Sequence, residues 1–152
     1  HNFPLLSLVL VGSDRGIAKQ LNVTDEWANI SPPVIHFDTV NEKQLLALYR
    51  QAAMLAYPSF YEGFGLPVLE AMACGIPVVA SHAASIPEVL GDTGILLDPN
   101  DLQGWTKTMI DLVDNKSEQQ RLGELGRSRS KEFTWERAAR ATLDVYRRVY
   151  GT

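Results

Sequence analysis

The sequence predicts an α/β fold, a Rossmann-like parallel sheet with helices on both faces in three layers. Short runs of Val, Leu and Ile alternate with longer amphipathic segments along the whole chain, and this alternation is typical of parallel sheets. Most of the short runs are apolar at nearly every position, as in strands that are buried on both faces. With 152 residues, the chain fits a single domain spanning 1–152.

Five apolar runs are predicted to form strands, and they cover residues 5–11, 34–37, 54–57, 78–80 and 95–97. The first run, Leu5 to Val11, is nearly continuous Leu and Val and ends at Gly12. It is therefore expected to be buried on both faces. Pro58 ends the third run because proline cannot donate a hydrogen bond to a neighbouring strand.

Segments with helical periodicity follow most of these runs, at residues 17–21, 42–53, 66–74, 85–90, 101–113, 118–131 and 135–150. Their ends carry the expected residues. Asn41 and Thr134 are suited to cap the N-termini of the helices that follow them. Gly75 is suited to end a helix, and Pro87 fits a first turn, where a missing N–H costs little.

Composition excludes several classes of function. The net charge of −4 and the pI near 5.3 argue against a nucleic-acid partner. The single cysteine, Cys74, cannot form an internal disulfide, and no Cys/His group has the spacing of a zinc site. No apolar run approaches the length of a membrane span, and no signal peptide is visible. The expected location is the cytoplasm, with peripheral membrane association left open for the full-length protein.

One segment carries most of the chemistry. Glu62 follows a predicted strand and precedes the turn Gly63-Phe64-Gly65, and Glu70 lies eight residues further on. The turn should open a helix whose first N–H groups point at an anion beyond the sheet. Ligands of open α/β sheets bind at the carboxyl ends of the strands. The two carboxylates could therefore face a nucleotide-sugar; otherwise Glu62 is a solvated loop residue and Glu70 interacts only with the helix dipole.

The segment resembles the Glu-x7-Glu motif of glycosyltransferase family 4, the retaining enzymes with a GT-B fold. The matching residues are Glu62-Gly63-Phe64-Gly65-Leu66-Pro67, Glu70-Ala71-Met72-Ala73-Cys74-Gly75 and Pro77-Val78-Val79-Ala80-Ser81. Further agreement lies in residues 8–12, 45–49, 86–89, 94–99 and 133–135, so the resemblance covers almost the whole chain in order. It implies the C-terminal, donor-binding domain of such an enzyme.

The resemblance also implies roles for individual residues. Glu62 would contact the donor sugar and phosphate and be needed for catalysis, and Glu70 would hold the ribose hydroxyls. Backbone N–H groups across the stretch Gly63, Phe64, Gly65, Leu66 and Pro67 would bind the sugar and diphosphate. A backbone contact near Val40 would bind the base. The donor would be a UDP- or GDP-sugar, a hexose would be transferred with retention to a glycan or lipid-linked acceptor, and neither a metal nor a cofactor is expected.

Two parts of the family's pattern are missing from the sequence: the N-terminal acceptor domain, and the first strand of the donor domain with the Arg and Lys that grip the diphosphate. The chain alone is therefore expected to be incomplete and inactive. An upstream segment, the N-terminal domain or a second copy of the chain is expected to pair with the incomplete sheet. The alternative function is a non-catalytic module of the same fold that binds nucleotide-sugars or serves as an interaction scaffold.

Overall fold

A computed structural model describes residues 6–13 and 34–151 of the chain. The helix predicted at residues 17–21 lies outside the described residues. Contacts divide the chain into two compact units, His1–Leu46 and Ala47–Thr152, which are described separately below. The single domain predicted for residues 1–152 stays a prediction.

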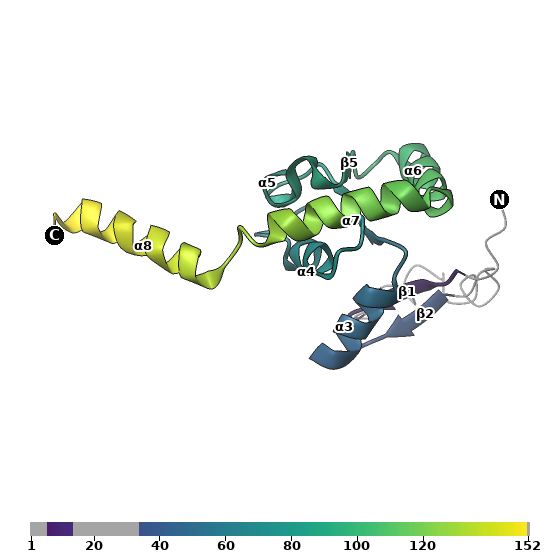
Figure 1. Ribbon diagram of the computed structural model, residues 1–152, viewed down its shortest axis with the longest axis horizontal. Helices are drawn as coiled ribbons and strands as arrows, with labels where there is room; N and C mark the ends of the chain where they lie inside the picture. The colour runs from purple at the N-terminus through teal and green to yellow at the C-terminus, as the bar shows by residue number, and fades with distance from the viewer. Residues whose placement is uncertain (1–5, 14–33, 152) are drawn as a thin grey trace. The chain divides into compact units, whose positions relative to one another are not determined.

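The described elements follow the predicted order of strands and helices (Figure 1). Their bounds are β1 (Leu8–Val11), β2 (Val34–Phe37), α3 (Glu42–Gln51), β3 (Leu55–Tyr57), α4 (Leu66–Cys74), β4 (Val78–Ser81), α5 (Ile86–Leu90), the short 3-10 helix η1 (Gly91–Thr93), β5 (Ile95–Leu97), α6 (Leu102–Asp114), α7 (Lys116–Ser130) and α8 (Trp135–Tyr150). The predicted bounds of β2, α4, β5 and α8 are confirmed, and the other predicted elements differ by one to three residues at one or both ends. The 3-10 helix η1 was not predicted.

The strands form two parallel sheets. Strands β1 and β2 pair in the first unit, with Leu8 opposite Val34, and β3, β4 and β5 pair in the second.

The prediction that the first strand is buried on both faces is wrong. Leu8 of β1 is 52% exposed and Val11 is 45% exposed. The described part of the first unit contains only β1, β2 and the beginning of α3, and these elements are too few to cover both faces of a sheet.

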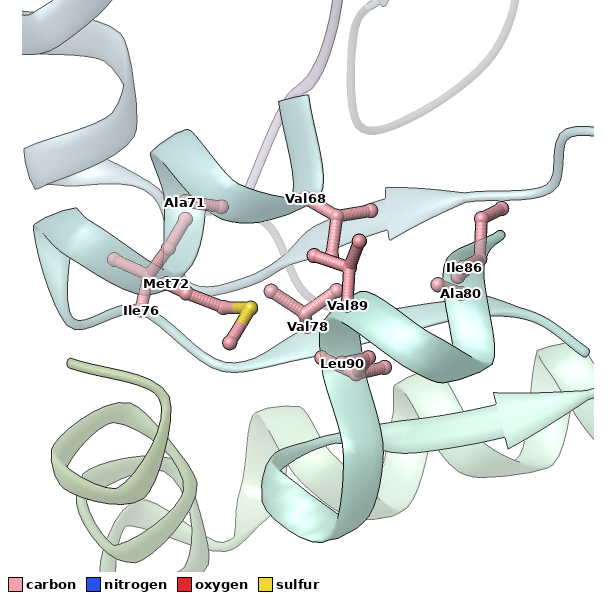
Figure 2. Packing of buried hydrophobic residues seen from close by; sticks show 9 residues of the cluster. All are labelled: Val68, Ala71, Met72, Ile76, Val78, Ala80, Ile86, Val89 and Leu90. Carbon is pink, nitrogen blue, oxygen red and sulfur yellow. The ribbon is translucent and has the colours of Figure 1, made fainter. Parts of the chain in front are cut away.

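The core of the second unit lies on both faces of β4, the central strand of its sheet. Val78 and Ala80 point to one face, where they join Val68, Ala71 and Met72 of α4 and Ile86, Val89 and Leu90 of α5; Figure 2 shows these side chains packed together. Val79 points to the other face and packs with Trp105 and Leu112 of α6 and Leu122 of α7. Alternation along one strand therefore places helices on both faces of the sheet.

Helix α4 ends in close contact with α7. Gly75 caps α4 in the left-handed region, at φ +74°. A Cβ on Gly123 of α7 would overlap the carbonyl oxygen of Gly75, and a Cβ on Gly126 would lie 3.4 Å from Cγ of Met72. Glycines at these two positions of α7 therefore allow the helices to approach at backbone distance.

Two arginines of α7 bind the C-terminal carbonyl groups of α4 and α5. Nη2 of Arg127 donates to the carbonyl oxygen of Cys74 at 2.9 Å. Arg129 donates from Nε to Val89 and from Nη2 to Glu88, at 2.8 and 2.6 Å. Cations at helix C-termini are favourable because the last carbonyl groups have no partner within the helix. Helix α7 thus holds the ends of both helices that cover one face of the sheet.

Helix α8 begins at the predicted cap, since the side chain of Thr134 accepts from the N–H of Arg137 at 3.1 Å. None of its residues is buried. Its two tyrosines, Tyr146 and Tyr150, are 58% and 78% exposed.

Substitution of Gly123 by alanine should destabilise the protein. A new Cβ would overlap the Gly75 carbonyl, and two backbones cannot separate without disturbing the core. We expect a net loss of about 2 kcal/mol in the free energy of unfolding, although alanine favours helix by about 1 kcal/mol. Gly63→Ala is the matched control, because a Cβ there meets nothing within 4 Å. Equal stability of the two variants in urea unfolding would contradict the packing argument.

Candidate functional site

The candidate site lies at the carboxyl edge of the sheet in the second unit. Strands β3, β4 and β5 are parallel, so their carboxyl ends share one edge. Glu62 follows β3, His82 follows β4 and Asp98 follows β5. His82 and Asp98 line an open hollow together with Leu96 and Pro99. This edge is where ligands of open α/β sheets bind.

The carboxylate of Glu62 is held by two hydroxyl groups. Tyr57, the last residue of β3, donates to Oε1 of Glu62 at 2.6 Å, and Ser59 donates to the same oxygen at 2.8 Å. The hydroxyl of Ser85, just before α5, donates to the backbone carbonyl of Glu62 at 3.1 Å. Glu62 is half-buried. Its position is therefore set by hydrogen bonds to both its side chain and its backbone, in contrast to a freely solvated loop residue.

The turn after Glu62 leads directly into α4. Gly65 precedes the helix at φ +92°, a left-handed conformation that favours glycine. The N–H groups of Val68 and Leu69 bond to the carbonyl of Gly65, and no side chain caps the helix. Pro67 lies in the first turn, as predicted. Since proline has no N–H and the N–H groups of Val68 and Leu69 bond to Gly65, the first turn of α4 offers an anion the N–H of Leu66 and the positive end of the helix dipole.

The centre of the turn is open on one side and packed on the other. Gly63 has no neighbour within 4 Å of where its Cβ would lie, so packing within the described chain does not require glycine there. The ring of Phe64 meets the ring of Phe133 edge to face, with centroids 6.0 Å apart. The guanidinium carbon of Arg129 lies 5.6 Å from the centroid of Phe133. The segment after α7 therefore touches the glycine turn.

Glu70 lies on α4, in the turns that follow this loop. It is exposed, and its Oε2 accepts a hydrogen bond from the hydroxyl of Tyr49 in α3 at 3.0 Å. Leu66 is 52% exposed at the beginning of the same helix. Val40 is half-buried and belongs to the first unit, three residues beyond β2. The structure thus places Glu62, the turn and Glu70 in one unit.

Four residues that hold Glu62 and Glu70 were not predicted: Tyr49, Tyr57 and Ser59, which donate to the carboxylates, and Ser85, which donates to the backbone carbonyl of Glu62. The roles of Ser59 and Tyr57 could have been predicted from the sequence, because both lie within five residues of Glu62 at the end of a strand. Tyr49 and Ser85 lie 21 and 23 residues from their partners. Contacts at that separation depend on how helices pack, which local sequence patterns do not encode.

Cys74 lacks the features of an activated nucleophile. Burial raises the pKa of its thiol, and Glu70 adds to that effect, whereas Arg50 and Arg127 oppose it. A raised pKa keeps the thiol protonated and unreactive. Among residues 6–13 and 34–151, no group of three His, Cys, Asp or Glu side chains could hold a metal ion. No helix in the described ranges is both long enough and apolar enough to cross a membrane.

Both tyrosines that bind the carboxylates resist ionisation. Burial raises the pKa of Tyr49, and the charge of Glu70 adds to the shift. Burial also raises the pKa of Tyr57, followed by its hydrogen bond to Glu62. In both cases the folded-state pKa lies well above the ordinary value of 10.0. The two hydroxyls therefore remain donors at neutral pH.

Stability should fall in alkaline solution because of these two groups. Each tyrosine has a higher pKa in the folded than in the unfolded state, so folding favours its protonated hydroxyl. The resulting contribution to the free energy of unfolding is complete below pH 10 and is lost as the pH rises toward the folded-state pKa. Urea unfolding between about pH 8 and pH 11 should show a steeper loss of stability for the natural chain than for the double variant Tyr49→Phe/Tyr57→Phe. Parallel curves for the two proteins would refute this assignment.

Comparison with known proteins identifies the family. The protein-family model described as "Glycosyl transferases group 1" matches residues 2–129 of the chain. O-antigen chain mannosyltransferase B of Escherichia coli is 42% identical over 108 residues, which are 71% of this chain and 28% of that protein. The contacts among the described residues do not by themselves identify this family.

Two solved structures show the same fold. Sucrose-phosphate synthase from Thermosynechococcus elongatus superposes with a TM-score of 0.75 at 29% identity, covering 95% of this chain and 38% of that one. HepE from Anabaena, in complex with UDP-glucose, gives 0.74 at 20% identity, with coverages of 86% and 37%. The chain spans less than two fifths of each relative. Its α/β fold is that of GT-B glycosyltransferases, and the chain belongs to the glycosyl transferases group 1 family.

Proposed function

We propose that the chain is the donor-binding half of a retaining glycosyltransferase that takes a hexose from a nucleoside-diphosphate sugar. One observation carries the proposal: the carboxylate of Glu62 is held by two hydroxyls immediately before a helix that no side chain caps. A fixed carboxylate and a helix N-terminus suit a ligand that combines sugar hydroxyls with a diphosphate. The family, and a structural neighbour that contains UDP-glucose, support the same ligand class.

Within this proposal, each predicted residue has a role. Glu62 contacts the sugar and the departing phosphate and is the catalytic residue. The backbone of Gly63, Phe64, Gly65, Leu66 and Pro67 lies along the sugar and diphosphate, and the glycines allow close approach. Glu70 binds the ribose hydroxyls, and the backbone near Val40 binds the base. Glycosyl transfer breaks the bond between the anomeric carbon and the phosphate oxygen and forms a bond to the acceptor oxygen on the same face, and the proton of the acceptor hydroxyl passes to the departing phosphate oxygen.

The leaving diphosphate gains negative charge as the bond breaks. The N-terminus of α4 is suited to stabilise that charge, because its dipole and N–H groups are fixed before the reaction begins. We propose that donor binding requires neither a metal nor another cofactor. We also propose that an N-terminal domain or an upstream segment completes the site. A second copy of the chain could pair with the incomplete sheet in the same proposal.

Donor binding should be visible as a thermal shift of this chain with UDP, GDP, ADP and their sugars, with and without magnesium. A ligand at a hundredfold excess over its dissociation constant stabilises the folded state by about 2.7 kcal/mol. We expect a shift with one base, independent of magnesium and removed by Glu70→Ala. Glu124→Ala, at an exposed glutamate of α7, is the matched control. A shift that survives Glu70→Ala would overturn the ribose assignment.

Catalysis should depend on Glu62 in the full-length protein. Glu62→Gln keeps the size of the side chain but removes its charge, and we expect glycosyl transfer to fall by about 10²–10⁴-fold, with stability unchanged. Proton NMR of the product should show the anomeric configuration of the donor. Near-normal transfer by Glu62→Gln would assign catalysis elsewhere. Donor binding without transfer in the natural full-length protein would favour the non-catalytic alternative.

A further inference from the structure

The two carboxylates of the proposed donor site are held in the same way. Each accepts a hydrogen bond from a tyrosine hydroxyl that comes from a different element. Tyr57 at the end of β3 donates to Oε1 of Glu62 at 2.6 Å. Tyr49 in α3 donates to Oε2 of Glu70 at 3.0 Å. Hydrogen bonds from a hydroxyl to a charged acceptor are about 2.5–2.7 Å long and stronger than those between neutral groups. The bond to Glu62 has this length, and the bond to Glu70 is longer.

The hydrogen bonds to the carboxylate of Glu62 involve only one of its two oxygens. Both hydroxyls, those of Tyr57 and Ser59, donate to Oε1. Within the part of the chain that the structure describes, no donor reaches Oε2 of Glu62. The two donors fix the direction of the carboxyl group, and the second oxygen keeps its capacity to accept a hydrogen bond or interact with positive charge.

Packing holds the tyrosine rings in place. Both Tyr49 and Tyr57 pack against the cluster of buried side chains formed by α4, β4 and α5. Their rings therefore remain fixed by the core, while their hydroxyls extend to the carboxylates. A Tyr→Phe substitution removes only the hydroxyl and keeps this packing, which separates the positioning of a carboxylate from the stability of the core.

We propose that Tyr57, with Ser59, positions Glu62 for the chemical step, and that Tyr49 positions Glu70 for donor binding. Neither tyrosine needs to touch the substrate; each acts through its carboxylate. The inference rests on the proposed function, in which Glu62 serves catalysis and Glu70 serves affinity. It adds separate roles for two hydroxyl groups, so the same Tyr→Phe substitution should affect kcat at one site and KM at the other.

A purely structural role is the competing interpretation. The Tyr49 hydroxyl could serve only to join α3 to α4, and the Tyr57 hydroxyl only to order the loop before α4. Loss of either hydroxyl would then lower stability and leave kcat and KM unchanged at temperatures where the protein is folded. Kinetics measured well below the unfolding temperature therefore distinguish the two interpretations.

The experiment uses the full-length protein and measures release of UDP or GDP from UDP-glucose and GDP-mannose, with water as the acceptor. We expect Tyr57→Phe to lower kcat by about ten- to a hundredfold with little change in KM, because a hydrogen bond to a charged group is lost. We expect Tyr49→Phe to raise KM and the dissociation constant of the nucleoside diphosphate by about three- to tenfold, a smaller effect because Glu70 is exposed. Tyr150→Phe, on α8, is the matched control for loss of a tyrosine hydroxyl.

Ser59 offers a test by rescue. Ser59→Ala removes the second donor to Glu62 and should lower kcat in the same way as Tyr57→Phe. Ser59→Thr restores a hydroxyl on the same carbon and should recover most of the lost rate. If the Ser59 hydroxyl positions Glu62, Ser59→Thr should recover the rate that Ser59→Ala loses. If Ser59→Thr is as slow as Ser59→Ala, the positioning role of this hydroxyl is refuted.

Glu62→Gln and Glu70→Gln separate failure of this inference from failure of the proposed function. If Glu62→Gln abolishes turnover while Tyr57→Phe keeps a normal kcat, the positioning role of Tyr57 is refuted and the catalytic role of Glu62 stands. If both tyrosine variants change kcat and KM together, the assignment of separate roles is wrong. If the full-length protein neither binds UDP or GDP nor releases them from the two donors, both the proposed function and this inference fail.

Discussion

The backbone contact between α4 and α7 is the constraint on which the candidate site depends. Gly123 allows α7 to reach the carbonyl of Gly75, and Arg127 and Arg129 bind the last carbonyl groups of α4 and α5. With their C-terminal ends held by α7, both helices present their N-terminal ends at the carboxyl edge of the sheet. Tight packing at one end of α4 therefore sets the position of the glycine turn at the other, because a close-packed helix moves as a rigid body.

The proposed site presents a carboxylate, which can accept hydrogen bonds from hydroxyl groups, beside the positive end of a helix dipole, which suits an anion. The carboxylate of Glu62 is oriented by two hydroxyls, and within residues 6–13 and 34–151 no arginine or lysine forms an ion pair with it. The beginning of α4 has no side-chain cap, whereas α6, α7 and α8 are each capped by a side chain. A folded chain gains stability when such groups are satisfied. Leaving them available at one edge of the sheet is the arrangement expected of a binding site.

Most of the secondary structure could be predicted because its signals are local. Thr134, Gly75 and Pro87 act within a few residues of the ends that they mark, so α8, α4 and α5 were placed nearly as the structure has them. The exposure of β1 was mispredicted. A continuous Leu/Val run indicates that a strand can be buried on both faces, but burial requires other elements to cover it, and no local pattern contains that information.

The α/β class, the order of the elements, and the turn with its two glutamates follow from periodicity, caps and spacing along the chain, so they could be predicted without coordinates. The groups that hold those glutamates are brought to them only by folding. Ser85 reaches Glu62 across 23 residues, and Tyr49 reaches Glu70 across 21. These contacts arise when α5 and α3 pack beside α4, and the geometry of packed helices is set by side chains distant in sequence acting together.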